Sequence, residues 1–121
     1  MIRGLGLDVV AVERVAGMLE RHGSRLLDRC FSPGEAARPR DPEHLAGLLA
    51  AKEAAFKAIG TGWGEGVGWK DVTVERNASG APTLRIGGGA AKRMERLGAA
   101  HAHLSITHAG GVAAAVVVLE S

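Results

Sequence analysis

The chain has 121 residues, of which 46% are hydrophobic and 23% are charged, and its formal net charge is +2. This length and composition are typical of one globular domain and argue against a disordered chain. The small positive excess does not indicate a nucleic-acid binder, the single Cys30 excludes an intramolecular disulfide, and no apolar run approaches the ~18 residues of a membrane span.

The first predicted element is a strand over Ile2 to Val10. Because successive side chains of a strand point to opposite faces, Asp8 shares one face with Gly4 and Gly6, and apolar side chains occupy the other. Two glycine neighbours would let a ligand approach the backbone closely, which makes Asp8 a candidate binding residue. An aspartate that ends the strand or caps the next helix is the alternative. No export signal is recognised here, so a cytoplasmic location is expected.

A basic helix is predicted from Val12 to His22, ending at Gly23. Its candidate binding residues are spaced by four, three and four positions and are Arg14, Met18, Arg21 and Arg25. Because Gly23 is expected to interrupt the helix, Arg25 could belong to a second short helix. A solvated charged face is the usual explanation of such a stripe. The alternative is a docking surface for an acidic helix, with the Met18 thioether as an adaptable contact.

Two further helices are predicted in the middle of the chain. Ser32 to Glu35 forms a capping-box pattern that predicts a short helix. The strongest helical segment runs from Glu43 to Ile59, is rich in Ala, Leu, Lys and Glu, and has Asp41 as its cap. It is expected to stop at Gly60.

Lys52, Glu53 and Lys57 are the charged residues of the otherwise uncharged stretch from Leu45 to Ala58. Glu53 and Lys57 lie four residues apart, so an ordinary surface ion pair explains them. The lack of other charges instead suggests a mostly buried helix, where charged groups need partners. Asp8 and Glu53 could supply the one or two carboxylates that Mg²⁺ takes from a protein, with phosphate and water completing its shell. Lys52 and Lys57 would then neutralise phosphate charge.

The second half of the chain predicts hairpins and one short helix. Gly60 to Gly68 has glycine at every second position and predicts an irregular loop, but neither it nor the Gly4-Leu5-Gly6 stretch completes a standard nucleotide-binding motif. The remaining predicted elements are strands over Asp71 to Arg76 and Pro82 to Ile86, a helix over Ala90 to Leu97, and strands over His101 to Thr107 and Val112 to Leu119. The continuous apolar run of the last strand suggests burial on both faces. The expected class is α+β: one domain over residues 1–121, with a mainly antiparallel sheet packed against a long helix and shorter helices.

Polar side chains share one face of the predicted strand at His101 to Thr107. His101, His103, Ser105 and Thr107 form a row of hydrogen-bond donors, and His108 points the other way or sits in the turn. A solvated edge strand explains this row. The alternative is phosphate binding, to which imidazole and hydroxyl groups are better suited than to zinc.

A series of short motifs runs through almost the whole chain in a fixed order. They are GLGLD at 4–8, FSPGE at 31–35, LAG and AAKEA within 45–54, KAIGTG at 57–62, VGWKD at 67–71, GAP at 80–82 and HLSITH at 103–108. Together they resemble the holo-[acyl-carrier-protein] synthase family of phosphopantetheinyl transferases. In two places the chain departs from the family pattern: Leu48-Leu49 stands where members often have Arg-Phe, and the segment 38–44 looks short.

The resemblance implies site residues, a cofactor and partners. It implies that Asp8 and Glu53 bind Mg²⁺, that Lys57 contacts a coenzyme A phosphate, that Gly62 and Pro82 lie near the nucleotide, and that His103 lies near the reacting phosphates. It also implies a homotrimer with active sites between subunits, whose basic first helix docks the acyl carrier protein.

The implied reaction transfers 4'-phosphopantetheine from coenzyme A to a carrier-protein serine and releases adenosine 3',5'-bisphosphate. A metal-bound water, Glu53 or His103 could take the serine proton. The motifs do not distinguish a carrier protein of fatty acid biosynthesis from one of polyketide synthesis. Two other hypotheses are a non-catalytic module that binds coenzyme A or a carrier protein, and an unrelated Mg²⁺-dependent nucleotide hydrolase.

Overall fold

A long central helix, α3 (Pro42–Ile59), organises the molecule, which is described by a computed structural model over residues 1–37, 41–60 and 66–121. The Asp41 carboxylate accepts a hydrogen bond from the His44 amide at 3.2 Å and caps the start of the helix. Gly60, at φ 84°, ends it in a left-handed conformation. Both predicted ends of this helix are therefore confirmed.

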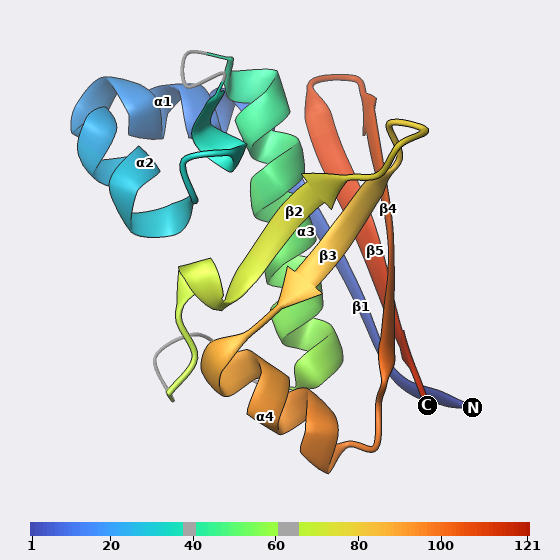
Figure 1. The fold of residues 1–121 in the computed structure, drawn as a ribbon. Helices are drawn as coiled ribbons and strands as arrows, with labels where there is room; N and C mark the ends of the chain where they lie inside the picture. Colours follow the sequence, from blue (N-terminus) through green and yellow to red (C-terminus); the bar gives the residue numbers. More distant parts are fainter. Residues whose placement is uncertain (38–40, 61–65) are drawn as a thin grey trace.

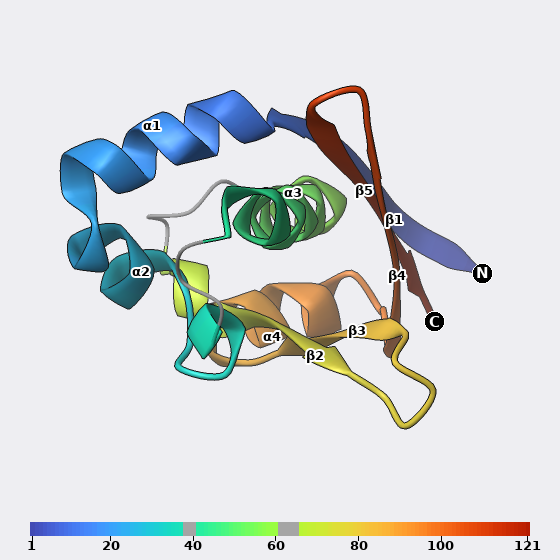
Figure 2. The same cartoon turned by 90° about the horizontal axis from the view of Figure 1, so that it is seen from above.

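A three-stranded antiparallel sheet covers one side of α3 (Figures 1 and 2). Its strands are β1 (Ile2–Ala11), β5 (Val112–Glu120) and β4 (His101–Ala109), with β5 in the centre. Both ends of the chain lie at the same end of this sheet (Figure 1). There the Met1 ammonium donates to the Ser121 hydroxyl oxygen at 3.1 Å, and the Ser121 amide donates to the Met1 carbonyl at 3.0 Å.

The glycines of β1 allow the strand to touch the backbone of α3. A Cβ atom on Gly6 would lie 1.8 Å from the Ala54 carbonyl oxygen, and one on Gly4 would lie 2.2 Å from the Ala58 carbonyl oxygen. No side chain fits in either gap. The expectation that these glycines make room for a ligand is therefore wrong, because the helix itself fills the space.

The other elements surround α3 on its remaining sides (Figure 2). They are helices α1 (Val12–His22), α2 (Ser24–Cys30) and α4 (Gly88–Arg96), short 3₁₀ turns η1 (Glu35–Ala37) and η2 (Trp69–Asp71), and the hairpin of β2 (Val72–Arg76) and β3 (Pro82–Ile86). Gly23, at φ 52°, separates α1 from α2, as predicted. The capping box is also formed, with the Ser32 amide donating to Glu35 and the Glu35 amide donating to Ser32.

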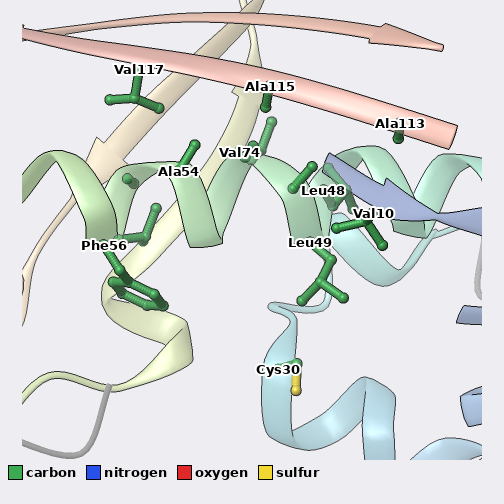
Figure 3. Close-up of a cluster of buried hydrophobic side chains, with 14 of the residues drawn as sticks. Val10, Cys30, Leu48, Leu49, Ala54, Phe56, Val74, Ala113, Ala115 and Val117 are labelled. Atoms are coloured by element: carbon green, nitrogen blue, oxygen red, sulfur yellow. The ribbon is translucent and has the colours of Figure 1, made fainter. Parts of the chain in front are cut away.

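The core lies around α3 and is built mainly from small and aliphatic side chains (Figure 3). The side chains of β5 alternate: Ala113, Ala115, Val117 and Leu119 are buried, and those between them are half-buried. The prediction of a β5 strand buried on both faces is therefore wrong, because only the face towards α3 is covered. The α+β prediction, with an antiparallel sheet on a long helix, is confirmed.

The other face of the three-stranded sheet exposes apolar side chains. Leu5, Leu7 and Val9 of β1 are 64%, 61% and 57% exposed. The neighbouring side chains on β5 are half-buried, and those on β4 are polar. A row of this kind is unusual for a surface that faces water alone. In the described part of the chain, no helix is long and apolar enough to cross a membrane.

Candidate functional site

Two carboxylates meet where β1 crosses α3. Asp8 follows Gly6 on the inner face of β1, and Glu53 precedes Ala54, whose carbonyl faces Gly6. The close approach of strand and helix thus brings the carboxyl groups of Asp8 and Glu53 within hydrogen-bonding reach of each other. Of residues 45–59 of α3, only Glu53 and Lys57 escape full burial.

The electrostatics of this pair indicate a missing positive charge. Burial, with further contributions from the hydrogen bond and the negative charge of Asp8, raises the pKa of Glu53 to about 7. The Asp8 Oδ2 atom is buried and has no hydrogen-bond partner among the described residues. Two carboxylates in contact are stable only with a proton or a cation between them. The site is therefore suited to binding a cation.

Lys57 lies beside the pair, one helical turn after Glu53. Its ammonium group donates to Asp8 Oδ1 at 2.9 Å and to the Leu7 carbonyl at 3.1 Å. The Lys57 side chain is 58% exposed, whereas that of Asp8 is 10% exposed. Lys57 thus contacts the acidic pair at one edge and is accessible to a ligand from solvent.

The basic residues of α1 and α2 extend outward from this site. Arg14 is close enough to Glu53 to lower the pKa of that carboxyl, together with Lys57. Arg21 and Arg25 are exposed and Met18 is half-buried. His22, Arg25, Leu26 and Arg29 line a depression on the same pair of helices, of which His22, Leu26 and Arg29 were not predicted as site residues. These residues come together because the chain changes direction at Gly23, between α1 and α2. The regular spacing of the predicted stripe assumes one continuous helix and therefore does not predict this grouping.

The polar row of β4 lies on the opposite face of the sheet from Asp8. His103, Ser105 and Thr107 are exposed, and the alternate side chains Leu104 and Ile106 pack against the core. The Nε2 atom of His103 lies 2.8 Å from Oε1 of Glu120, and the hydrogen bond between them lowers the pKa of the Glu120 carboxyl. His108, which is also exposed, contacts the Glu43 carbonyl oxygen of α3 at 3.0 Å, which agrees with the first of its two predicted alternatives, a side chain that points away from the row. Within one chain, the β4 row and Asp8 do not form a common site.

Lys52 is not part of the acidic site. Its side chain is fully buried on another side of α3 and pairs with Glu35, whose side chain is also fully buried, at 2.9 Å. The prediction that Lys52 neutralises ligand phosphate is not supported by this position, because no solvent reaches its ammonium group. The expectation that the charged groups of a buried helix need partners is correct, and for Lys52 that partner is Glu35.

The remaining predicted residues belong to the nucleotide side of the expected site. Gly62 lies outside the described residues. Pro82 begins β3, directly after a turn in which Gly80 has φ 85°, and it belongs to the two-stranded sheet rather than to the sheet that carries Asp8. Leu48 and Leu49, which replace the Arg-Phe of the family pattern, are buried core residues (Figure 3).

The acidic pair can supply part of a metal-binding shell. The described residues hold no group of three or more His, Cys, Asp and Glu side chains that could bind a metal alone. Mg²⁺ commonly takes only one or two carboxylates from a protein and completes its octahedron with water and substrate phosphates. The residues present therefore fit a Mg²⁺ ion that shares its ligands with a phosphate compound.

The chain matches a known protein family over almost its whole length. Residues 4–117 match the family model of the 4'-phosphopantetheinyl transferase superfamily. The chain is 50% identical to the holo-[acyl-carrier-protein] synthase of Solidesulfovibrio magneticus over 122 residues, which cover 99% of each protein.

Solved structures share the fold over the whole chain. The holo-[acyl-carrier-protein] synthase of Neisseria meningitidis is 31% identical, with a TM-score of 0.88 and full coverage of both chains. The Helicobacter pylori enzyme, solved in complex with coenzyme A, is 29% identical, with a TM-score of 0.85 over 96% of this chain and 99% of that one.

Proposed function

Because this chain belongs to the 4'-phosphopantetheinyl transferase superfamily, and within it to the holo-[acyl-carrier-protein] synthases, we propose that its reaction takes place at Asp8 and Glu53 with Mg²⁺. The family transfers 4'-phosphopantetheine from coenzyme A to an apo acyl carrier protein, so the chain is a transferase. The observation that carries the location is the buried Oδ2 atom of Asp8, which has no hydrogen-bond partner among the described residues, in a carboxyl group that acts directly on Glu53. A cytoplasmic site of action and a role in fatty acid biosynthesis remain predictions.

The chain's own residues would hold and orient the diphosphate. When bound, Mg²⁺ would neutralise phosphate charge and stabilise the charge that develops as the phosphoanhydride breaks. Asp8 and Glu53 would hold the ion, and the exposed ammonium group of Lys57 would move from Asp8 to a phosphate oxygen. The nucleotide half of coenzyme A is expected against Gly62 and Pro82.

The transfer itself exchanges one phosphorus–oxygen bond for another. The serine hydroxyl oxygen of the carrier protein bonds to the pantetheine-side phosphorus, the bond to the bridging oxygen breaks, and adenosine 3',5'-bisphosphate leaves. The serine proton goes to Glu53 or to His103. Glu53 is at the site within one chain, whereas His103 would have to come from a second copy.

A homotrimer with active sites between subunits would supply that second copy. The exposed apolar row of Leu5, Leu7 and Val9 lies on the same face of the sheet as His103 and Ser105. Covering this face with other copies would bury the apolar row, and would let the polar row of one copy reach the Asp8 site of its neighbour. The described face thus supports an assembly in which each site is completed by two chains.

The decisive test is the intact mass of an apo carrier protein incubated with this protein, coenzyme A and Mg²⁺. We expect a mass increase equal to one phosphopantetheine group, and a loss of rate of at least about a hundredfold in Asp8→Ala and in Glu53→Ala. Glu75→Ala, which changes an exposed carboxylate on β2, is the control and should keep full activity.

The outcomes separate the alternatives. An unmodified carrier protein, under conditions where a known synthase works, would favour a non-catalytic binding module. Release of nucleotide without modification of the carrier would favour a hydrolase. Full activity in both alanine variants would remove the metal assignment.

A further inference from the structure

A buried ion pair joins α3 to the side of the molecule that faces away from the three-stranded sheet. Lys52 Nζ lies 2.9 Å from Glu35 Oε1, and both side chains are fully buried. The Lys52 ammonium also donates to the Trp69 carbonyl at 3.0 Å and to the Val72 carbonyl. These three acceptors account for all three of its protons.

The Glu35 carboxylate is equally well bound. Its Oε1 atom accepts from the Ser32 amide at 2.9 Å, and its Oε2 atom accepts from the Val74 amide at 2.7 Å. The pair therefore ties four segments together: the loop before η1, helix α3, turn η2 and strand β2. The ring of Phe31 lies 5.7 Å from the Lys52 ammonium and closes the site on one side.

This network and the β1 glycines hold α3 from two directions. On the sheet side, Gly4 and Gly6 touch the carbonyls of Ala58 and Ala54. On the side of η2 and β2, Lys52 is held by directional hydrogen bonds. Successive residues of a helix project about 100° apart, so a fixed direction for Lys52 also fixes the direction in which Glu53 leaves the helix.

A buried charge pair is a costly way to obtain stability alone. Burial lowers the pKa of Lys52, and Glu35 only partly offsets this effect. Apolar residues of similar volume often replace such a pair without loss of stability. An apolar pair could not form the directional hydrogen bonds that Glu35 and Lys52 make with the backbone of the loop before η1, of η2 and of β2.

We propose that Glu35 and Lys52 are positioning residues, which hold the rotation of α3 so that the Glu53 carboxylate meets Asp8. The inference rests on the proposed metal site. Neither residue touches a substrate or the metal. They act through Glu53, from a direction about 100° away around the same helix.

The test is metal binding by folded variants, measured by the Mn²⁺ electron paramagnetic resonance signal in the presence of coenzyme A. The double variant Glu35→Leu/Lys52→Met removes both charges and keeps apolar volume. We expect its Mn²⁺ affinity to fall by about tenfold or more, as is typical when groups that support metal ligands are lost. The matched control is Leu45→Ala, which opens a cavity two helical turns from Lys52.

The control separates positioning from general destabilisation. Leu45→Ala, compared at a temperature where it and the double variant are equally folded, should bind Mn²⁺ with the affinity of the unchanged protein. If the double variant is folded and binds Mn²⁺ as the unchanged protein does, the positioning role is wrong. If the control loses the same affinity, the effect is one of stability and the proposal also fails.

A milder variant covers the case in which the double variant does not fold. Glu35→Gln keeps one oxygen acceptor and the side-chain length, and we expect it to weaken Mn²⁺ binding without abolishing it. Unchanged Mn²⁺ affinity in folded Glu35→Gln would also overturn the proposal. Failure of the metal site itself would look different, because Asp8→Ala would then bind Mn²⁺ as well as the unchanged protein does.

Discussion

Single side chains set the chemistry of the acidic site through their immediate neighbours. Asp8 and Glu53 are both ordinary carboxylates, but burial, together with the hydrogen bond and charge of Asp8, raises the pKa of Glu53 to about 7, and Asp8 Oδ2 has no partner among the described residues. Among residues 45–59 of α3, only Glu53 and Lys57 are not buried. Next to Asp8, this common sequence pair forms a site that favours the binding of a positive charge.

The Glu53 carboxyl should make the stability of the metal-free protein depend on pH. The folded protein holds this proton more tightly than the unfolded chain, in which the pKa has its ordinary value of 4.5. Stability is therefore lost as the pH rises from about 4.5 to about 7. In Glu53→Gln this loss disappears, so its melting temperature in EDTA should equal that of the unchanged protein near pH 4.5 and exceed it above pH 7. Parallel melting curves across this range would contradict the assignment.

At the scale of elements, helix ends and turns could be predicted because local chemistry decides them. The Asp41 cap, the breaks at Gly23 and Gly60, and the strand β3 were predicted at or within one residue of their observed positions. The direction of Lys52 could not be predicted, because a helix that is buried almost all round has no polar face to orient it. The role of Gly4 and Gly6 depends on which element packs against β1, and alternation along a strand does not contain that information.

The contact between β1 and α3 should tolerate no added methyl group. In Gly6→Ala the new Cβ would meet the Ala54 carbonyl, and backbone must move, so we expect a loss of about 3 kcal/mol in the free energy of unfolding. Urea denaturation measures this loss. In the control, Gly34→Ala, the new Cβ meets nothing within 4 Å and stability should change by less than about 0.5 kcal/mol.

Helix α1 should separate carrier docking from coenzyme A binding. Arg21 is exposed and is not among the groups that act on Glu53, whereas Arg14 is. We therefore expect Arg21→Glu to raise the KM for an acidic carrier protein by about tenfold and leave the KM for coenzyme A unchanged. Arg14→Glu should affect both the carrier KM and kcat.

Steady-state kinetics with each substrate varied in turn measures these effects. Arg96→Glu on α4 is the control and should leave both KM values unchanged. Equal effects of Arg21→Glu and Arg96→Glu would point to a general effect of charge rather than to docking on α1.

For the whole molecule, the central fact is that two groups of polar residues lie on opposite faces of one sheet. Asp8 faces α3, and His103 faces outward next to an exposed apolar row. A single chain cannot bring them together without refolding the sheet. An assembly of copies can, and that arrangement makes a prediction about mixtures of variants.

Asp8→Ala and His103→Ala should each be inactive alone and should regain activity when mixed. If sites form between chains, random reassembly at equal amounts leaves about one quarter of the sites with both original residues. Phosphopantetheine transfer after unfolding and joint refolding measures this recovery, and light scattering gives the molar mass. No recovery in an assembly of confirmed trimeric mass would show that His103 serves its own chain or has no role.

Because Met1 and Ser121 lie together, the order of the elements along the chain can be changed by circular permutation. Met1 and Ser121 are hydrogen-bonded to each other at the end of neighbouring strands, so a short linker could join them into a closed ring. New ends could then be opened at the exposed turn between β2 and β3, held by Asn77 and Gly80. A circularly permuted chain of this kind would keep the strand pairing of the sheet and would carry a fused partner on the hairpin, away from the end of the sheet where Met1 and Ser121 lie.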